Sequence, residues 1–296
     1  MRLGLLYSRV RPEERMIMEA ASAQGVEIVP IHADSLVLDV SNGELPEAFR
    51  GIDMVLDRCL SHTRALALLR ALELWGVPCC NSWSVRELCG DKLATNLALA
   101  AAGVPVPNAR LGFGEAGGVE AVEQLGYPAV LKPLVGSWGR LLARVNDRDA
   151  AEAVIEHRVS LGSHHHGVVF AQEHIEKGGR DLRIFVIGDE VACAIVRESD
   201  HWVTNTARGA SVQALAVGSE LGELCLAAAR AVGGGALAID VFESPRGLLV
   251  NEVNATMEFR NSVEPTGVDL PGLLVRHALN EVCTSANDEL CSGGVR

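Results

Sequence analysis

The chain has 296 residues, enough for a large buried core shared by two or three domains. Hydrophobic residues make up 48% of the sequence but aromatic residues only 4%, so the core must consist mainly of Ala, Leu and Val. The net charge of −12 argues against a sequence-independent nucleic-acid binder. The sequence contains no run of 18 uncharged apolar residues, so we predict no membrane span.

The first 82 residues alternate between strand and helix patterns. Two predicted helices, one ending at Gly25 and one capped by Ser61, lie among the predicted strands RLGLLYS, VEIVPIHA, DMVLDRCL and VPCCN. This order predicts a Rossmann-like α/β domain whose parallel sheet is covered on both faces. Ligands bind such sheets at the carboxyl ends of the strands, which are marked here by Ser8, Arg9, Asp57, Arg58 and Asn81.

Residues 83–165 and 166–280 are predicted to form two further units of the α+β class. The first contains the helix DKLATNLALAAAG, a Pro-containing linker, and two helices around the strands YPAVLKP and LLARV. The second contains the strand VVFAQEHI, the hairpin LRIFVIGDEVACAIV, a helix, and two apolar strands within residues 236–259. Residues 281–296 are polar and contain glycine, so we expect a disordered tail there.

The cysteines and the N-terminal segment indicate the cellular compartment in which the protein works. Eight cysteines occur without a C-x-x-C pair, and a chain of this size does not need disulfides to fold. The apolar stretch after Met1 is too short for a signal peptide. We therefore expect reduced thiols and a cytoplasmic location.

Residues 236–259, ALAIDVFESPRGLLVNEVNATMEF, carry the strongest chemical signal. Glu252 and Asn254 are two residues apart and so point to the same face of a strand. If the hairpin loop has three residues, 245–247, with its last glycine in the left-handed conformation, Asp240 falls directly opposite Glu252.

Two carboxylates that close repel one another, so one should bind a proton or a cation. The oxygens of Asp240, Glu252 and Asn254 suit Mg²⁺, which typically combines one or two carboxylates with substrate phosphates. The alternative is a solvated strand face, although apolar residues flank these positions on both strands.

Two lysines and a glycine loop indicate a phosphate site. Lys132 lies in the apolar strand AVLKP, where its ammonium either snorkels to solvent or points at an anion. The loop that follows, with Gly136, Ser137 and Gly139, can bring backbone N–H groups to a phosphate or can be an ordinary hairpin turn. Lys92 lies in a helix first turn, where the dipole disfavours a cation, so it either meets a ligand or is a surface lysine.

Several further patterns carry weaker signals. The strand end Gln172–Glu176 either reads an adenine edge or is solvated, and Arg183, Arg197 and Arg208 either bind anions or form structural ion pairs. Gly112–Gly117 matches G-x-G-x-x-G but lacks a long βαβ unit and the downstream acidic residue, so we reject a dinucleotide site. The tract His164–His166 has no further ligands at metal spacing and is predicted to be a loop.

The order of a strand lysine with a glycine loop, a Gln-Glu strand end, D-x-F and N-E-x-N resembles the ATP-grasp superfamily, and within it the RimK-like amino-acid ligases. The likeness covers residues 1 to about 280 and is strongest to the LysX and ArgX group. The segments that carry it are RVRPEER, CGDKLAT, YPAVLKPLVGSWGRLLARV, QEHIEKGGRDLRIFVIG, HWVTNTARG and GLLVNEVNATMEFRNSVEPTGVDLPG.

The resemblance implies an ATP-grasp fold and a role for each site residue. It implies ATP and two Mg²⁺ ions as cofactors, with Lys92 and Lys132 on the ATP phosphates. Arg208 would steady the transferred phosphoryl group. The remaining assignments are the phosphate loop Gly136, Ser137 and Gly139, the adenine hinge Glu173 and Ile175, the ribose-side acid Asp181, the Mg²⁺ ligands Asp240, Glu252 and Asn254, and the amino-acid pocket Arg197, Asn205 and Thr256.

The resemblance also implies the reaction. An acylphosphate forms on the C-terminal glutamate of a carrier protein, LysW, and the amino group of 2-aminoadipate attacks it in lysine biosynthesis. Arg9, Arg11, Arg58 and Arg64, near strand ends of the first domain, are predicted to receive the acidic carrier tail. A homodimer or homotetramer is expected.

Ala255 and Ala210 depart from the family pattern near the acceptor pocket. Glutamate is therefore an alternative acceptor, since one methylene changes binding by only about 1–3 kcal/mol. Two more functions are compatible with these residues, namely a RimK-type protein glutamate ligase and a nucleotide-binding regulator.

Overall fold

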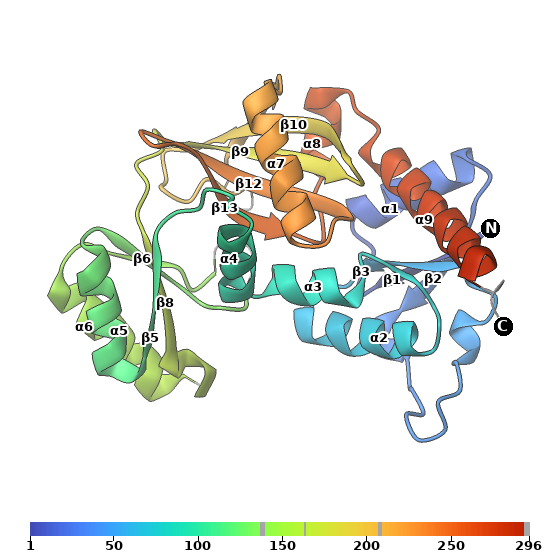
Figure 1. The fold of residues 1–296 in the computed structure, drawn as a ribbon, viewed down its shortest axis with the longest axis horizontal. Coiled ribbons are helices and arrows are strands. Elements are labelled where there is room, and N and C mark those ends of the chain that lie inside the picture. The colour runs from blue at the N-terminus through green and yellow to red at the C-terminus, as the bar shows by residue number, and fades with distance from the viewer. Residues whose placement is uncertain (137–139, 163, 207–208, 293–296) are drawn as a thin grey trace.

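The computed structural model describes residues 1–136, 140–162, 164–206 and 209–292, which form three sheets with helices packed around them (Figure 1). The first sheet is parallel, in the order β2-β1-β3-β4. Its strands are β1 (Arg2–Tyr7), β2 (Glu27–His32), β3 (Met54–Arg58) and β4 (Cys79–Cys80). β3 is buried along its whole length, as expected of a strand with helices on both faces.

The helices of this domain begin and end where the sequence predicts. α1 (Pro12–Ala23) has proline at its first position, and Gly25 follows with a φ of +68°. α2 (His62–Leu74) begins at the cap Ser61, whose hydroxyl accepts the N–H of Arg64 at 3.4 Å. Short 3-10 helices lie at Ala33–Ser35 and Glu47–Phe49.

The second sheet is antiparallel, in the order β11-β10-β9-β12-β13. Its strands are β9 (Arg180–Ile187), β10 (Glu190–Glu198), β11 (Ser211–Leu215), β12 (Ala236–Ser244) and β13 (Gly247–Asn254). One face packs on α3 (Trp83–Gly90), α4 (Lys92–Ala101) and α7 (Ser219–Ala231). The other face packs on α1, α8 (Arg260–Thr266) and α9 (Leu270–Ser292).

The third sheet forms a separate lobe, in the order β5-β8-β6-β7 (Figure 1). It contains β5 (Ala109–Phe113), β6 (Ala129–Lys132), β7 (Ala143–Val145) and β8 (Val168–Glu173). α5 (Gly114–Leu125) and α6 (Arg148–Leu161) pack on it around a core of their own. The 3-10 helix His164–Gly167 includes the histidine tract that the sequence predicted as a loop.

The structure moves the predicted domain boundaries. β8 pairs with β5 and β6, so the small lobe extends to Glu173 and does not end at 165. Val85, Leu99 and Val104 are buried against the second sheet, so residues 83–106 belong to that sheet and not to the small lobe. The tail that the sequence predicted to begin at residue 281 includes the last part of α9, which extends to Ser292.

Glycines in the rejected G-x-G-x-x-G segment have a packing role. A Cβ on Gly112 would lie 2.1 Å from the carbonyl oxygen of Gly117, so β5 and α5 approach too closely for any side chain. Among the described residues, none of the helices combines the length and the apolarity needed to cross a bilayer.

The hairpin β12–β13 gives the predicted pairing by a different route. Its loop has two residues, because Ser244 pairs with Gly247, and this alone would offset Asp240 from Glu252 by one position. A register shift at Asn251, a β-bulge, restores the pairing of Asp240 with Glu252.

Candidate active site

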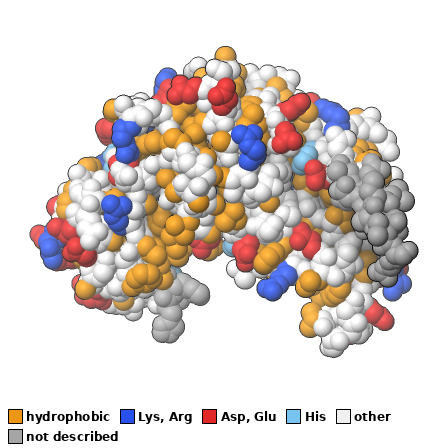
Figure 2. All heavy atoms as spheres, in the orientation of Figure 1, with side chains coloured by type: hydrophobic (Ala, Val, Ile, Leu, Met, Phe, Trp, Pro, Cys, Tyr) orange, Lys and Arg blue, Asp and Glu red, His pale blue; other side chains and the backbone are white. Residues whose placement is uncertain are grey.

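A cavity of about 760 Å³ is lined by residues from the first domain, the small lobe and the second sheet. The first domain contributes Arg9, Glu13 and Cys59, the small lobe contributes Lys132, and the second sheet contributes Asp240. Figure 2 shows the molecule hollowed between the lobe of α5 and α6 and the lobe of α2. Groups distant in the sequence therefore meet in one space.

Both predicted phosphate lysines reach this cavity. The ammonium of Lys92 donates to the carbonyl of Gly136 at 2.7 Å and lies 3.4 Å from a carboxylate oxygen of Glu252. Lys132 is buried, and its desolvation lowers its pKa to about 8, with the charge of Glu252 opposing the shift and that of Lys92 adding to it. The two ammonium groups therefore reach the cavity from different elements, Lys92 from α4 and Lys132 from β6.

Asn251 is a site residue that sequence reasoning missed. Its side-chain oxygen accepts from the ammonium of Lys132 at 2.9 Å and from the amide of Gln172 at 3.2 Å. Adjacent residues of a regular strand point to opposite faces, yet Asn251 and Glu252 both line the cavity because the bulge re-aims one of them. No sequence signal marks a bulge at this point of β13, since no glycine lies at or next to Asn251.

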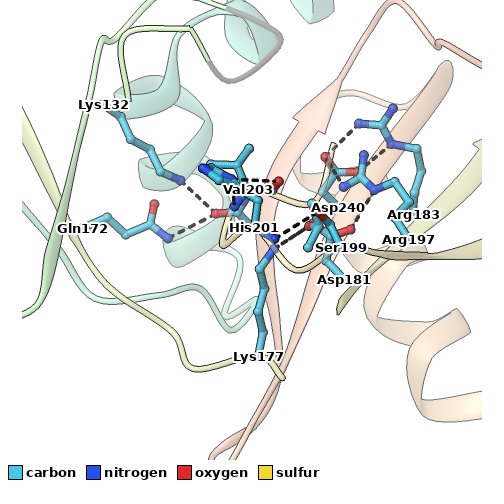
Figure 3. A network of polar contacts seen from close by, with 12 residues as sticks. Lys132, Gln172, Lys177, Asp181, Arg183, Arg197, Ser199, His201, Val203 and Asp240 are labelled. Atoms are coloured by element: carbon cyan, nitrogen blue, oxygen red, sulfur yellow. Dashed lines mark hydrogen bonds and ion pairs between the residues drawn. The ribbon is translucent and has the colours of Figure 1, made fainter. Parts of the chain in front are cut away.

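A network of buried charges lies on β9, β10 and β12 of the second sheet, where it lines the cavity (Figure 3). Arg183 donates to both carboxylate oxygens of Asp240, at 2.7 and 2.8 Å, and Arg197 lies 3.2 Å from one of them. Arg197 also donates to Asp181 at 2.7 Å, and Lys177 lies 3.2 Å from the same carboxylate. Burial would raise the pKa of Asp240, but the two arginines outweigh it and hold the pKa at about 2.

The donor set Asp240, Glu252 and Asn254 fits Mg²⁺ in its chemistry. The amide nitrogen of Asn254 donates to the carbonyl of Ala238 at 3.3 Å, which leaves the amide oxygen for a ligand. The low pKa of Asp240 keeps its carboxylate ionised, as a metal ligand must be. Arg183 and Arg197 already bind this carboxylate, so a metal ion would share its oxygens with them. Among the described residues, no group of three or more His, Cys, Asp or Glu forms a metal cluster.

The predicted nucleotide-base residues lie along the same cavity. Glu173 ends β8, accepts the N–H of Asn108 at 2.6 Å and pairs with Arg246. Ile175 and Asp181 also line the cavity, the latter within the charge network. The structure thus brings these residues together and leaves their adenine and ribose roles as predictions.

The predicted amino-acid pocket is partly assembled. Arg197, Asn205 and Thr256 line the cavity, and the hydroxyl of Thr256 accepts from Arg86 of α3. Arg86 also donates to the carbonyl of Cys59 at 3.0 Å, which ties the first domain to this wall. The predicted Arg208, Ser137 and Gly139 lie outside the described residues.

Of the four arginines predicted to form a basic mouth for the carrier, only Arg9 is exposed and lines the cavity, and Arg11 is buried in ion pairs with Glu14 and Glu258. Arg58 is only 3% exposed, since it donates to Glu14 at 3.0 Å and to the carbonyl of Met257 at 2.8 Å. Arg64 pairs with Asp34 on the surface and does not line the cavity. Arg58 lies at the end of β3, a position that suggested an exposed side chain. Its hydrogen bond to Met257, in the loop after β13, buries it instead.

Comparisons with known proteins agree with this geometry. The RimK-like ATP-grasp domain matches residues 89–277, and the LysX preATP-grasp domain matches residues 3–88. The alpha-aminoadipate–LysW ligase LysX of Sulfurisphaera tokodaii is 34% identical over 93% of this chain and 96% of its own. The glutamate–LysW ligase ArgX of Sulfolobus acidocaldarius is 33% identical over 95% and 99%.

A solved structure has the same arrangement of elements. The crystal structure of a RimK-domain ATP-grasp protein from Sphaerobacter thermophilus superimposes with a TM-score of 0.77. It is 30% identical and covers 94% of this chain and 100% of its own. The three-sheet architecture is therefore shared along nearly the whole chain.

Proposed function

This chain belongs to the RimK-like ATP-grasp ligases, and from that premise we propose that it joins the C-terminal glutamate of a LysW-type carrier protein to the amino group of 2-aminoadipate, in lysine biosynthesis. The observation that carries the proposal is the likeness of residues 3–88 to the LysX preATP-grasp domain. That domain supplies Arg9, Glu13 and Cys59 to the cavity wall, so the likeness extends to the site.

The reaction that these residues support has two steps. The carrier carboxylate attacks the γ-phosphate of ATP, releasing ADP and forming an acylphosphate, and the amine then displaces phosphate to form the amide. Lys92 and Lys132 neutralise charge on the phosphates, and Arg208 steadies the transferred group. Catalysis by this chain is then a matter of positioning and electrostatics.

Asp240, Glu252 and Asn254 would hold Mg²⁺, and we assign two ions to the site. When bound, Mg²⁺ neutralises phosphate charge that the two lysines alone leave uncompensated. Arg183 and Arg197 keep Asp240 ionised and fixed on β12, so this carboxylate is preorganised as a ligand.

Glutamate is the second candidate acceptor. The near-equal similarity to an ArgX enzyme favours it, and Ala255, a small residue beside Thr256 on the cavity wall, gives no steric reason to exclude it. A methylene in an apolar pocket discriminates by only about 1–3 kcal/mol. A RimK-type ligase acting on another protein would instead dispense with the carrier.

The test is ADP release by the purified protein with Mg²⁺-ATP, LysW and either amino acid. We expect turnover that requires LysW, fails with LysW lacking its terminal glutamate, and prefers 2-aminoadipate. A preference for glutamate would assign the ArgX reaction. Turnover with other peptides but not LysW would contradict the carrier proposal.

We also propose a homo-oligomer, dimer or tetramer, and a cytoplasmic location. The described cysteines are free thiols, and burial raises the pKa of those at positions 79, 80 and 225. Unreactive thiols suit a reducing compartment. Light scattering on the purified protein measures the oligomeric state.

A further inference from the structure

Glu13 is a buried carboxylate that faces the cavity without a protein partner. The residue is 1% exposed and lines the cavity wall formed by the first domain. Its Oε1 is buried and has no hydrogen-bond partner within the described part of the chain. Leaving a buried acceptor unpaired is costly, so this oxygen is explained best by a donor that arrives with a ligand.

The neighbouring Glu14 shows what a structural carboxylate looks like at this place. It is fully buried, and its oxygens accept from Arg11, at 2.7 and 3.0 Å, and from Arg58 at 3.0 Å. Both glutamates are on the inward face of α1 with Ile17 and Ala21. One is therefore saturated by protein donors while the other is not.

The charge around Glu13 indicates the class of ligand. Arg9 and Arg260 are exposed and line the same cavity, and among the described residues neither has an ion-pair partner. Glu258, the other carboxylate on this wall, is occupied by Arg11. The wall thus offers one unpaired anion and two unpaired cations, which complements an amino acid with one ammonium and two carboxylates.

We infer that Glu13 binds the ammonium group of the acceptor amino acid. This rests on the proposed function, because it places the acceptor on the first-domain wall, beside Arg86 and Thr256. The N-terminus of α1 favours the negative charge that Glu13 needs for this role. Arg9 and Arg260 face the acceptor carboxylates from the rim.

The experiment compares amino acids with their deaminated analogues. Calorimetry on the full-length protein with Mg²⁺ and a non-hydrolysable ATP analogue measures binding of 2-aminoadipate against adipate and glutamate against glutarate. The wild type should prefer the amino acid by roughly 10- to 100-fold, the range for a hydrogen bond to a charged group. Glu13→Gln should remove this preference, and Glu13→Asp should restore part of it.

Stability separates binding from folding. Glu13→Gln should leave the Tm and the affinity for the ATP analogue unchanged, since it breaks no protein contact. The matched Glu14→Gln should lower the Tm, because it leaves Arg11 and Arg58 buried without their partner. An equal fall in Tm for both variants would make Glu13 structural and overturn the assignment.

Two further outcomes are decisive. A Glu13→Gln protein that keeps the preference for the amino acid, or a wild type that shows none, would overturn the inference. A wild type that shows the preference but no LysW-dependent turnover would defeat the proposed function and still support Glu13 as an ammonium site.

Discussion

Lys132 illustrates how burial sets the chemistry of a single residue. Its position in an apolar strand left snorkelling and anion binding as alternatives, and the structure shows its ammonium bonded to Asn251 inside the cavity. Desolvation lowers its pKa to about 8, so the side chain loses its charge as the pH rises through that value.

The pKa of Lys132 predicts a pH dependence of ATP binding. Only the ammonium form attracts phosphate, and it is the dominant form below about pH 8, so affinity should fall as the pH rises through that value. Between pH 7 and 9 we expect a loss of up to about tenfold. Lys132→Arg keeps its charge throughout and should give a flat profile, measured as the Kd for ATP. A flat profile for the wild type would contradict this prediction.

Among single residues, the sequence predicted the site positions of polar side chains that lie within apolar strands. Asp240, Glu252 and Lys132 interrupt apolar strands, and all three line the cavity. Asn251 also interrupts an apolar strand, but a regular strand would point it away from Glu252, and Glu13 lies in a polar helix start. Their importance comes from a bulge and from a missing partner, which exist only in the folded chain.

At the scale of elements, β9 and β12 are joined by two arginine–carboxylate pairs of different burial. Arg183 pairs with Asp240, with side-chain exposures of 14% and 7%. Arg180 pairs with Glu243, with exposures of 49% and 39%, at the same 2.7 Å distance. The chain therefore contains its own comparison of a buried and an exposed ion pair.

We predict unequal costs for removing these arginines. Arg183→Met should lower the free energy of unfolding by about 3–5 kcal/mol, because Asp240 keeps its charge with less compensation. Arg180→Met should cost less than about 1 kcal/mol, since water replaces the exposed partner. Urea unfolding of both variants measures the difference, and equal losses would show that burial does not control the strength of these pairs.

Elements with a clear period or cap were predicted, and short or context-dependent ones were not. α1, α2 and the hairpin β9–β10 follow their sequence patterns. α3 and the edge strands β5 and β11 escaped notice, because they are short and are stabilised by neighbours far away in the sequence.

At the scale of the whole molecule, two of the three sheets share a core. Leu5 and Ile17 of the first domain are buried in one cluster with Phe185, Ala238 and Phe259. The small lobe buries a separate cluster that includes Val122, Leu131 and Ile155. We therefore expect the first domain and the second sheet to unfold together and the small lobe to open independently.

Hydrogen exchange tests this division with two matched core deletions. Phe259→Ala should cost about 3–5 kcal/mol and speed exchange in both β1 and β12. Ile155→Ala should cost about 2–5 kcal/mol and speed exchange only within residues 109–173. Faster exchange of β1 in the Ile155 variant would show that all three sheets unfold as one unit.

The sequence by itself determined the fold class, most helices and strands, the position of Asp240, Glu252 and Asn254 on one hairpin, and the two lysines of the cavity. These depend on local periodicity, caps and polar residues within apolar strands, which are properties of neighbouring residues. The tertiary structure decided the domain boundaries, the burial of Arg58, the bulge at Asn251 and the unpartnered Glu13. Each of these depends on contacts between residues far apart in the chain, and burial and hydrogen-bond satisfaction are set by such contacts.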